Sequence, residues 1–244
     1  MIGFDLTPEQ KTIEEKARRF AREVILPAAA KHDRDGDFPL DIMQKAYAEG
    51  YLTPLVPKKY GGGGWGILDT CLLSEELASG DMGIFVSIFV STLALYPIIS
   101  FGTEDQKERF LRPFCSKYTL ASYCLSEPAA GSDPASMETT ATPDGNGYLL
   151  NGTKMWITNG GYADLFVVFA NTDRQKKHQG IISLIVPASS SGIRRGGPID
   201  KMGQRASNTT ALTFQNVRVG KKTSWEGRRK ASRRPWRRWI SPAP

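Results

Sequence analysis

The chain has 244 residues, of which 40% are hydrophobic, and its formal net charge is +7. Residues 221–244 hold nine Lys and Arg but one acidic residue, which leaves 23 basic and 24 acidic residues in the first 220. Because this body is nearly neutral, the overall charge gives no reason to expect a nucleic-acid partner, and no apolar run is expected to approach the roughly 18 residues of a membrane helix.

The first half of the chain has the spacing of amphipathic helices. In the helix predicted for residues 7–30, Thr7 is an N-cap, Pro8 takes the first helical position, and Gln10 completes a capping box. Apolar periodicity and caps predict four more helices, over residues 40–49, 67–79, 82–99 and 103–114. Residues 1–118 are therefore predicted to form an all-helical N-terminal domain.

Four consecutive glycines at residues 61–64 interrupt this helical region, within a loop over residues 54–66. A phosphate-binding P-loop needs a Lys followed by Ser or Thr after its glycines, and that pair is missing here. We therefore expect a flexible turn that allows Trp65 to dock.

From Thr119 the pattern changes to short apolar runs of strand length. Strands are predicted over residues 120–125, 148–150, 154–157, 165–170, 181–186 and 209–219. Residues 141–147 are a turn cluster, and Asn151-Gly152 is expected to be the turn of a β-hairpin. Residues 119–219 are predicted to be a middle β-barrel domain, so the fold class is α+β, with a ligand favoured where the two domains meet.

Two stretches contain residues suited to binding a flat or phosphorylated ligand. Residues 123–133 read Tyr-Cys-Leu-Ser-Glu-Pro-Ala-Ala-Gly-Ser-Asp, where small side chains allow close approach to the backbone and Ser126 and Ser132 supply hydroxyls. Taken alone, this stretch could equally be an ordinary tight turn. The second stretch, residues 154–161, reads Lys-Met-Trp-Ile-Thr-Asn-Gly-Gly. Taken alone, Trp156 could be barrel core and Ser126 an ordinary strand serine.

Together the two stretches resemble the signatures of the acyl-CoA dehydrogenase family. The resemblance rests on Cys124-Leu125-Ser126-Glu127, Ala130-Gly131-Ser132-Asp133 with Ser136, Trp156-Ile157-Thr158-Asn159-Gly160, Lys201-Met202-Gly203-Gln204-Arg205 and Lys59-Tyr60-Gly61-Gly62. It covers about residues 4–219. It implies a helical N-terminal domain, a middle β-barrel and a C-terminal four-helix bundle, with FAD between the barrel and the bundle. Because the chain ends before that bundle, we expect a truncated form.

The resemblance also implies the residues of the cofactor site. Those expected to bind FAD are Tyr123, Cys124, Leu125, Ser126, Gly131, Ser132, Trp156, Ile157 and Thr158. Ser132 is expected to meet the acyl-CoA substrate as well. Trp156 would pack by the edge of the isoalloxazine, and the Thr158 hydroxyl would reach toward its N5. An aromatic wall with nearby donors can hold the ring and stabilise charge on it.

The implied reaction is the dehydrogenation of an acyl-CoA thioester to the trans-2-enoyl-CoA, in fatty-acid or amino-acid catabolism. Electron-transferring flavoprotein would accept the electrons, and the intact family member would be a homotetramer. In the medium-chain branch of the family, which the chain resembles most, the catalytic base is a Glu of the C-terminal domain, so no catalytic residue is expected in this chain. Glu127, followed by Pro128 inside a cofactor loop, is expected to be structural, and neither His32 nor His178 receives a role. No metal site is expected.

Three cysteines far apart in the sequence, Cys71, Cys115 and Cys124, favour reduced thiols. The first residues lack the basic-then-apolar pattern of a leader. A cytoplasmic protein with no membrane and no nucleic-acid partner is therefore expected. Loss of the bundle is also expected to expose an apolar patch that drives association.

Residues 220–244 are predicted to be an unstructured basic tail, because they show neither helical nor strand periodicity. Their abrupt Trp, Arg and Pro content suggests the hypothesis of out-of-frame translation, which sequencing of the gene tests. Three alternatives remain open: a non-catalytic flavin- or acyl-CoA-binding remnant, a fusion whose tail binds nucleic acid or anionic membrane, and an oxidase or hydroxylase on the same fold.

Overall fold

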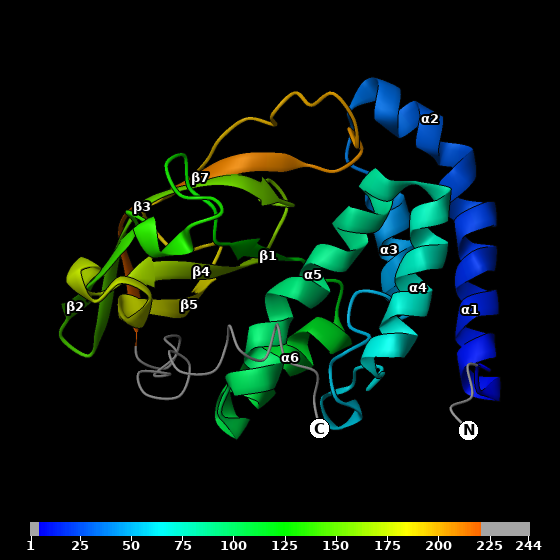
Figure 1. Ribbon diagram of the computed structural model, residues 1–244, viewed down its shortest axis with the longest axis horizontal. Coiled ribbons are helices and arrows are strands. Elements are labelled where there is room, and N and C mark those ends of the chain that lie inside the picture. The colour runs from blue at the N-terminus through cyan, green and yellow to red at the C-terminus, as the bar shows by residue number, and fades with distance from the viewer. Residues whose placement is uncertain (1–4, 221–244) are drawn as a thin grey trace.

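A computed structural model describes residues 5–220, and the helices and the sheet lie side by side in it (Figure 1). The helical elements are α1 (Pro8–Phe20), η1 (Ala21–Ile25), α2 (Leu26–Asp35), α3 (Leu40–Ala48), η2 (Lys58–Tyr60), α4 (Ile67–Gly80), α5 (Met82–Phe101) and α6 (Glu104–Ser116). They are followed by β1 (Ala121–Cys124), η3 (Pro134–Ser136), β2 (Thr140–Asp144), β3 (Gly147–Thr158), β4 (Leu165–Asn171), η4 (Arg174–Gly180), β5 (Ile181–Pro187), β6 (Ile193–Arg195) and β7 (Thr209–Gly220). This order confirms the predicted α+β fold class. The prediction for residues 221–244 falls outside the described residues.

The first predicted helix is longer than expected and includes a wider turn. The Thr7 capping box is present, but the helix passes through the π-helical turn η1 and continues to Asp35 rather than ending near residue 30. Pro27 follows this turn, and a proline cannot donate the helical hydrogen bond, so a locally wider turn accommodates it. The helix ends where Gly36 adopts φ +69°, a conformation that glycine adopts without strain.

Helix α4 approaches the first helix very closely. A Cβ atom at Gly80 would lie 2.9 Å from Cγ2 of Ile25, which explains why glycine ends this helix. Arg18 of α1 and Glu76 of α4 form an ion pair at 2.7 Å between Nη2 and Oε1. The two helices are thus joined by close backbone packing and by a polar contact at their edge.

Helix α5 lies between the other helices and the sheet. It has 20 residues and a mean hydropathy of 2.1, so within residues 5–220 it is the one helix long and apolar enough to span a membrane. The expectation that no apolar run approaches this length is therefore wrong. The most apolar 18-residue stretch of α5 is 56% buried inside the structure. The helix therefore also fits the buried core helix that was predicted for residues 82–99.

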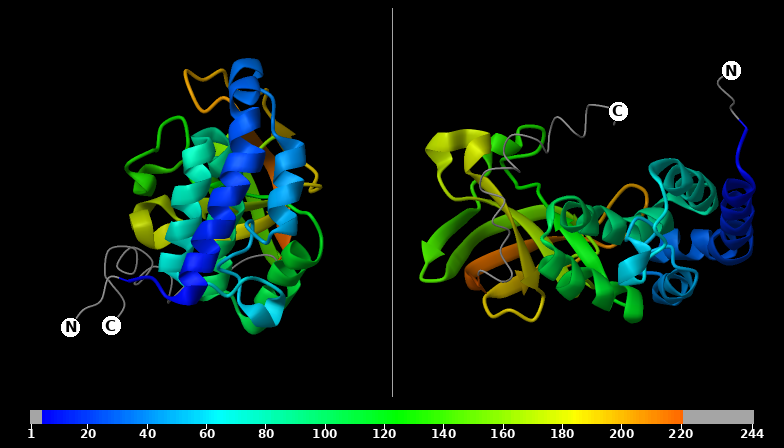
Figure 2. Two further views of the ribbon diagram at one scale, coloured as in Figure 1. Left: turned by 90° about the vertical axis from the view of Figure 1, so that its right-hand side faces the viewer. Right: turned by 90° about the horizontal axis from the view of Figure 1, so that it is seen from below.

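The strands form one curled mixed sheet, the half-barrel counterpart of the predicted barrel. The strand order is β1-β4-β2-β3-β7-β6, and β5 also pairs with β4. Strand β4 is parallel to β1, and most other neighbours are antiparallel. The three-residue strand β6 was not predicted, because Ile193-Arg194-Arg195 is too short and too basic to show alternation. Figure 2 shows the curl of the sheet from below.

The predicted hairpin at Asn151-Gly152 is wrong. β3 runs without interruption through these residues, and the register with β7 shifts between Leu150 and Gly152 as in a β-bulge. Gly152 has φ +146°, and a Cβ there would lie 2.5 Å from Oγ1 of Thr139. The glycine is thus required by a close backbone approach. The actual hairpin joins β2 to β3 through Gly145 and Asn146. The predicted turn cluster is therefore too long, because residues 141–144 belong to the strand β2, which was not predicted.

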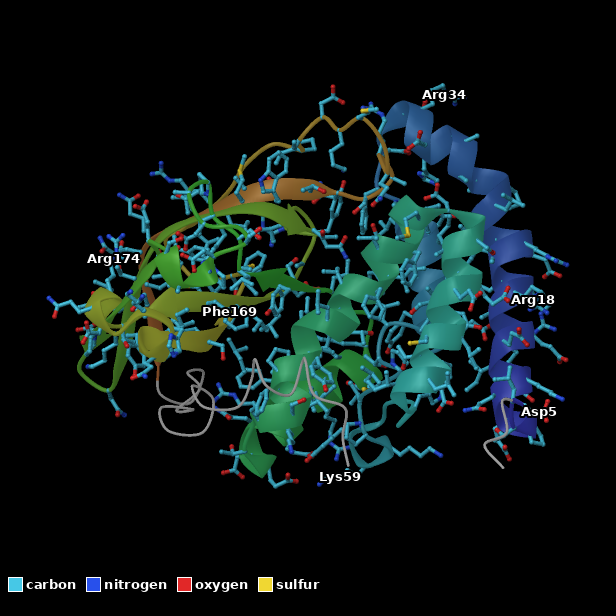
Figure 3. The ribbon with its side chains drawn as sticks, viewed as in Figure 1. Asp5, Arg18, Arg34, Lys59, Phe169 and Arg174 are labelled. Atoms are coloured by element: carbon cyan, nitrogen blue, oxygen red, sulfur yellow. The ribbon has the colours of Figure 1, made fainter. Side chains whose placement is uncertain are left out.

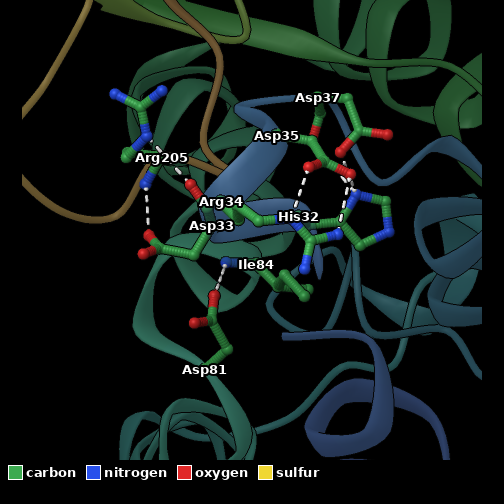
Figure 4. Close-up of polar contacts among 8 residues, drawn as sticks. All are labelled: His32, Asp33, Arg34, Asp35, Asp37, Asp81, Ile84 and Arg205. Atoms are coloured by element: carbon green, nitrogen blue, oxygen red, sulfur yellow. Dashed lines mark hydrogen bonds and ion pairs between the residues drawn. The ribbon is translucent and has the colours of Figure 1, made fainter. Parts of the chain in front are cut away.

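The loop between β6 and β7 reaches back to the helices. The backbone N–H of Arg205 donates to Oδ1 of Asp33 at 3.0 Å, and its Nε donates to the Asp33 carbonyl at 2.9 Å (Figure 4). Nearby, Oδ1 of Asp81 accepts from the N–H of Ile84 at 2.7 Å and caps α5. The sheet is therefore fixed to α2 by the stretch that contains the Lys201–Arg205 motif.

Two apolar clusters form the core. The larger runs from the helices into the inside of the curled sheet and includes Ile25, Leu77, Cys124, Ile157 and Phe214. The smaller lies between α5, α6 and the strands β1, β4 and β5, and Phe169 and Tyr123 pack at its edge (Figure 3). Strand β1 thus has apolar neighbours on both faces, which explains its nearly continuous burial.

Candidate functional site

The two stretches singled out from the sequence lie side by side. The Ser122 hydroxyl donates to the Thr158 carbonyl at 2.7 Å, and the N–H of Met155 donates to the Ser126 carbonyl at 2.9 Å. β1 and β3 are not neighbours in the strand order, so the curl of the sheet brings them together. These contacts make one surface from two segments about 30 residues apart.

A tight turn follows β1. The N–H of Glu127 donates to the Ala130 carbonyl at 2.9 Å, and the N–H of Ala130 donates back at 3.3 Å. The exposed residues Gly131 and Ser132 come next, and a Cβ built at Gly131 meets nothing within 4 Å. The backbone after the turn is therefore open to a ligand, as expected from its small side chains.

Asp133 fixes the end of this loop. Its Oδ1 accepts from the N–H of Ala135 at 3.1 Å, and its carbonyl accepts from the Ser136 hydroxyl at 2.7 Å. These contacts begin the short helix η3. The Ser-Asp pair of the first signature thus combines an exposed hydroxyl at Ser132 with a local cap.

Trp156 has an unusual backbone for a large aromatic residue. Its φ is +61°, in a register shift of β3 against β7, and its side chain is 57% exposed. Such a conformation costs on the order of 1–3 kcal/mol in a residue other than glycine and is concentrated at functional sites. The exposed ring excludes the alternative that Trp156 is barrel core. It presents an aromatic surface next to the loop of the first stretch.

Beneath this surface, Lys154 and Glu127 form an ion pair. Lys154 Nζ lies 2.7 Å from Oε1 of Glu127, and the two side chains are 0% and 3% exposed. The N–H groups of Glu138 and Thr139 also donate to the carboxylate, at 2.6 and 3.1 Å. Both carboxylate oxygens are therefore occupied, which gives Glu127 a structural role.

The protonation states fit a charged pair. Burial alone would raise the pKa of Glu127, but hydrogen bonds from Lys154, Thr139 and Glu138 hold it below its ordinary value. Burial lowers the pKa of Lys154, and the neighbouring carboxylate opposes this effect. A carboxylate with a lowered pKa and filled hydrogen-bonding positions is poorly suited to act as a general base.

The predicted FAD-binding residues differ in whether their side chains or only their backbone atoms are accessible to a ligand. Cys124 and Ile157 are 0% and 1% exposed, so only their backbones are available, and burial raises the pKa of the Cys124 thiol. The other seven residues are half-buried or exposed: Tyr123, Leu125, Ser126, Gly131, Ser132, Trp156 and Thr158. These residues come from the end of β1, the loop after it and the end of β3.

Tyr123 is half-buried and packs against an aromatic ring of β4. Its ring centroid lies 4.9 Å from that of Phe169, and burial raises the pKa of its hydroxyl to about 12. The phenol is therefore neutral at physiological pH and available as a hydrogen-bond donor.

Lys154 is a structurally central residue that the sequence interpretation left without a role. A lysine in an apolar strand, near an acidic residue of the other stretch, was a usable signal, because a buried charge needs a partner. His32 bonds to Asp37 through Nδ1 at 2.8 Å, whereas His178 is exposed on η4. Across residues 5–220, no cluster of three or more His, Cys, Asp or Glu is arranged to hold a metal ion.

Comparison with protein families gives two matches that cover most of the chain. Residues 7–118 match the acyl-CoA dehydrogenase N-terminal domain, and residues 122–217 match the acyl-CoA dehydrogenase middle domain. A curated relative, the probable medium-chain specific acyl-CoA dehydrogenase 2, mitochondrial, of Caenorhabditis briggsae, is 41% identical over 221 residues. That alignment covers 89% of this chain and 54% of the relative.

Solved structures resemble the fold over a similar range. The butyryl-CoA dehydrogenase of Megasphaera elsdenii is 35% identical with a TM-score of 0.87, covering 91% of this chain and 60% of that one. The FAD complex of PigA is 29% identical with a TM-score of 0.86, covering 92% and 59%. The chain thus spans little more than half the length of these relatives.

Proposed function

The chain belongs to the acyl-CoA dehydrogenase family, and from this premise we propose that its β1 loop and the end of β3 hold FAD for the dehydrogenation of an acyl-CoA. The substrate is an acyl-CoA thioester and the product a trans-2-enoyl-CoA. The proposal concerns the part of the reaction that the N-terminal and middle domains perform. Activity of the whole enzyme is a further part of the proposal, because the chain spans only part of its relatives.

One observation carries the proposal: the two signature stretches are joined by hydrogen bonds. Ser122 Oγ donates to the Thr158 carbonyl at 2.7 Å, and Met155 N–H donates to the Ser126 carbonyl at 2.9 Å. A planar ring and its attached pyrophosphate need contacts from both stretches at the same time. Segments on opposite sides of the molecule would have made that impossible.

The residues present fit a flavin. Trp156 offers an exposed aromatic face, and its strained backbone indicates a position kept for something other than stability. Gly131 offers open space beside its backbone, where a phosphate can approach. Bound FAD would supply the hydride acceptor of the reaction. The solved FAD complex of PigA supports a flavin site on this fold.

The protein groups have separate tasks in this proposal. Trp156 packs against the ring system, and the Thr158 hydroxyl stabilises negative charge that develops there. Ser132 and the backbone at Gly131 bind phosphate groups, and Ser132 also contacts the acyl-CoA. The buried residues Cys124 and Ile157 would keep water away from one side of the ring.

We assign no catalytic base among residues 5–220. Glu127 is an acidic residue inside the first signature, but its side chain is 3% exposed and its carboxylate is bonded to Lys154, Glu138 and Thr139. Removal of the substrate α-proton needs a carboxylate within hydrogen-bond reach of that proton. The family resemblance assigns this task to a Glu of the C-terminal domain.

The proposal includes partners of the complete enzyme. Electron-transferring flavoprotein is the electron acceptor, and the complete enzyme is a homotetramer. A cytoplasmic location remains a proposal from the cysteines alone. Each of these rests on the family resemblance or on composition rather than on a contact in residues 5–220.

A visible spectrum of the purified 244-residue chain, recorded after incubation with FAD, tests the proposal. We expect retained yellow colour after gel filtration. Addition of a fatty acyl-CoA then separates two functions: bleaching indicates a working dehydrogenase, and yellow colour that persists indicates a flavin-binding protein without the base. A colourless protein that has kept its fold by circular dichroism contradicts the proposed flavin site.

Reactivity with oxygen separates the dehydrogenase from the other enzyme class on this fold. If the flavin is reduced by dithionite and then mixed with air, a dehydrogenase is expected to reoxidise slowly. Rapid reoxidation with release of hydrogen peroxide favours an oxidase.

A further inference from the structure

We propose that Lys154 and Glu127 are positioning residues that fix the two flavin-binding segments relative to each other. This inference rests on the proposed flavin site but extends to residues that do not touch the ligand. The pair lies behind the surface formed by the β1 loop and the end of β3. Its two members come from the two different signature stretches.

Lys154 joins the stretches through two hydrogen bonds from one ammonium group. Nζ donates to the Leu125 carbonyl at 3.0 Å and to Oε1 of Glu127 at 2.7 Å. Leu125 and Ser126 are both predicted to bind FAD. One residue further along β3, Met155 N–H donates to the Ser126 carbonyl at 2.9 Å. The backbone of the first stretch is thus held at two successive carbonyls.

Glu127 extends the same connection to a third segment. Its carboxylate accepts from the N–H of Glu138 at 2.6 Å and from that of Thr139 at 3.1 Å. These residues follow η3 and therefore close the loop that carries Gly131 and Ser132. The carboxylate fixes both ends of this loop, while its turn is open to solvent at Pro128 and Ala129.

Lys154 also lies close to the strained residue Trp156 in β3. Trp156 adopts φ +61° two residues after Lys154, within the shifted register of β3. A residue in that conformation persists only where its surroundings hold it. Lys154 is 0% exposed and anchored at both of its acceptors, so it provides a fixed point from which the ring of Trp156 projects.

Stability alone does not explain a buried ion pair at this place. Replacing such a pair with apolar residues of similar volume is often neutral or stabilising, whereas removing one partner is strongly destabilising. Apolar side chains could not bond to the Leu125 carbonyl or to the two backbone N–H groups after η3. The geometry therefore favours a function in fixing these backbone segments.

The experiment compares three forms of the full chain. The double variant Glu127→Gln/Lys154→Met removes both charges but leaves an amide oxygen for the N–H groups of Glu138 and Thr139. The single variant Glu127→Gln keeps the lysine and both of its acceptor positions. If the first double variant does not melt cooperatively, Glu127→Leu/Lys154→Met replaces it, because exchanging both partners of a buried ion pair for apolar side chains often preserves stability.

Two readouts are measured on each form: hydrogen–deuterium exchange of peptides covering residues 123–133 and 154–161 without FAD, and the dissociation constant of FAD. In the double variant we expect exchange in both peptides to rise about tenfold or more, as for a segment that opens locally. We expect the dissociation constant of FAD to rise about tenfold as well, because an unfixed segment must be ordered on binding. Glu127→Gln leaves the buried Lys154 charge without its carboxylate, so we expect it to be less stable than the double variant and to exchange faster across the whole chain rather than in the two peptides alone.

A matched control uses the ion pair between α1 and α4. Arg18→Met/Glu76→Gln removes an interhelical pair of similar length, 2.7 Å, away from the proposed site. We expect FAD affinity and exchange in the two peptides to remain at the wild-type level. A general loss of stability would affect this control and the site variants alike.

Unchanged exchange and unchanged FAD affinity in a folded double variant overturn the positioning role. Faster exchange limited to these peptides supports it even if the wild-type chain binds no FAD, in which case the proposed flavin site fails separately. Equal losses in the control pair and the site pair also overturn it, because they indicate stability alone.

Discussion

The Ser122 hydroxyl donates a 2.7 Å hydrogen bond to the carbonyl of Thr158, and this contact joins the strand before the first signature to the end of the second. Ser122 is fully buried, so the bond is shielded from water. The contact links two strands that are not neighbours in the order of the sheet. The flavin site that we propose depends on this link.

Ser122→Ala tests the link directly. The substitution leaves the Thr158 carbonyl without its partner, so we expect a loss of about 1–3 kcal/mol in the free energy of unfolding. Urea denaturation followed by circular dichroism measures this loss. We also expect weaker FAD binding, because the Thr158 backbone is no longer fixed. Unchanged stability and unchanged affinity would show that the contact is incidental.

Trp156→Gly should separate stability from function. Glycine adopts φ +61° without strain, so relief of strain is expected to offset the lost ring contacts and to hold the free energy of unfolding within about 1 kcal/mol of the wild type. FAD affinity should fall, because the aromatic surface is gone. Trp156→Ala is the matched control: it loses the ring but keeps the strain, so it should be less stable than the glycine variant. The opposite order of stability would contradict the strain argument.

Gly152→Ala should be strongly destabilising. The new Cβ would lie 2.5 Å from Oγ1 of Thr139 at a φ of +146°, so we expect a loss of about 2–4 kcal/mol in the free energy of unfolding. Gly131→Ala is the control, because a Cβ there meets nothing within 4 Å, and it should change stability by less than about 0.5 kcal/mol. Thermal melts of the two variants measure the difference. Similar melts would contradict the bulge in β3.

Stability should depend on the ionisation of Glu127 at acid pH. The folded pKa of this carboxyl is below its ordinary value of 4.5, so the folded state binds fewer protons than the unfolded state in the window just below pH 4.5. The stabilisation is therefore fully present above pH 4.5 and is lost as the pH falls through the folded pKa. The difference in unfolding free energy between the wild type and Glu127→Gln should shrink through this window. A difference that does not change with pH would argue against an ionised Glu127.

We expect the chain to self-associate in solution. Large apolar side chains are exposed on the described surface, and they are Leu26, Leu40, Ile67, Leu68, Met82, Trp156, Tyr162 and Met202. Exposed apolar area of this kind promotes self-association. Sedimentation velocity at increasing protein concentration should show species heavier than a monomer. A monodisperse monomer throughout would contradict this expectation.

Helices were predicted well from the sequence where caps and periodicity act locally. Thr7 forms the predicted capping box, and Thr103 caps α6 in the same way. The extension to Asp35 was missed, because the helix ends only where Gly36 allows a left-handed residue. The turn predicted at Asn151-Gly152 was wrong because glycine is needed there for a different reason. Thr139 approaches the Gly152 backbone too closely for a Cβ atom, and only the folded sheet brings these residues together.

The two segments of the candidate site could be predicted from the sequence. The ion pair and the backbone conformation that hold these segments in place could not. The residue types of the two stretches indicated a ligand surface, and the resemblance indicated which ligand. The pairing of Lys154 with Glu127 depends on β1 and β3 meeting across the curl of the sheet, and that meeting has no local signal. The strained backbone of Trp156 likewise appears only when its register with β7 is known.

Equilibrium binding of FAD to the purified full chain tests the central claim most directly. The chain, dialysed against FAD and washed by gel filtration, is predicted to retain about one FAD per chain, and Trp156→Ala to retain much less. A folded wild-type chain that elutes colourless, or a Trp156→Ala variant that binds FAD as tightly as the wild type, would contradict the account.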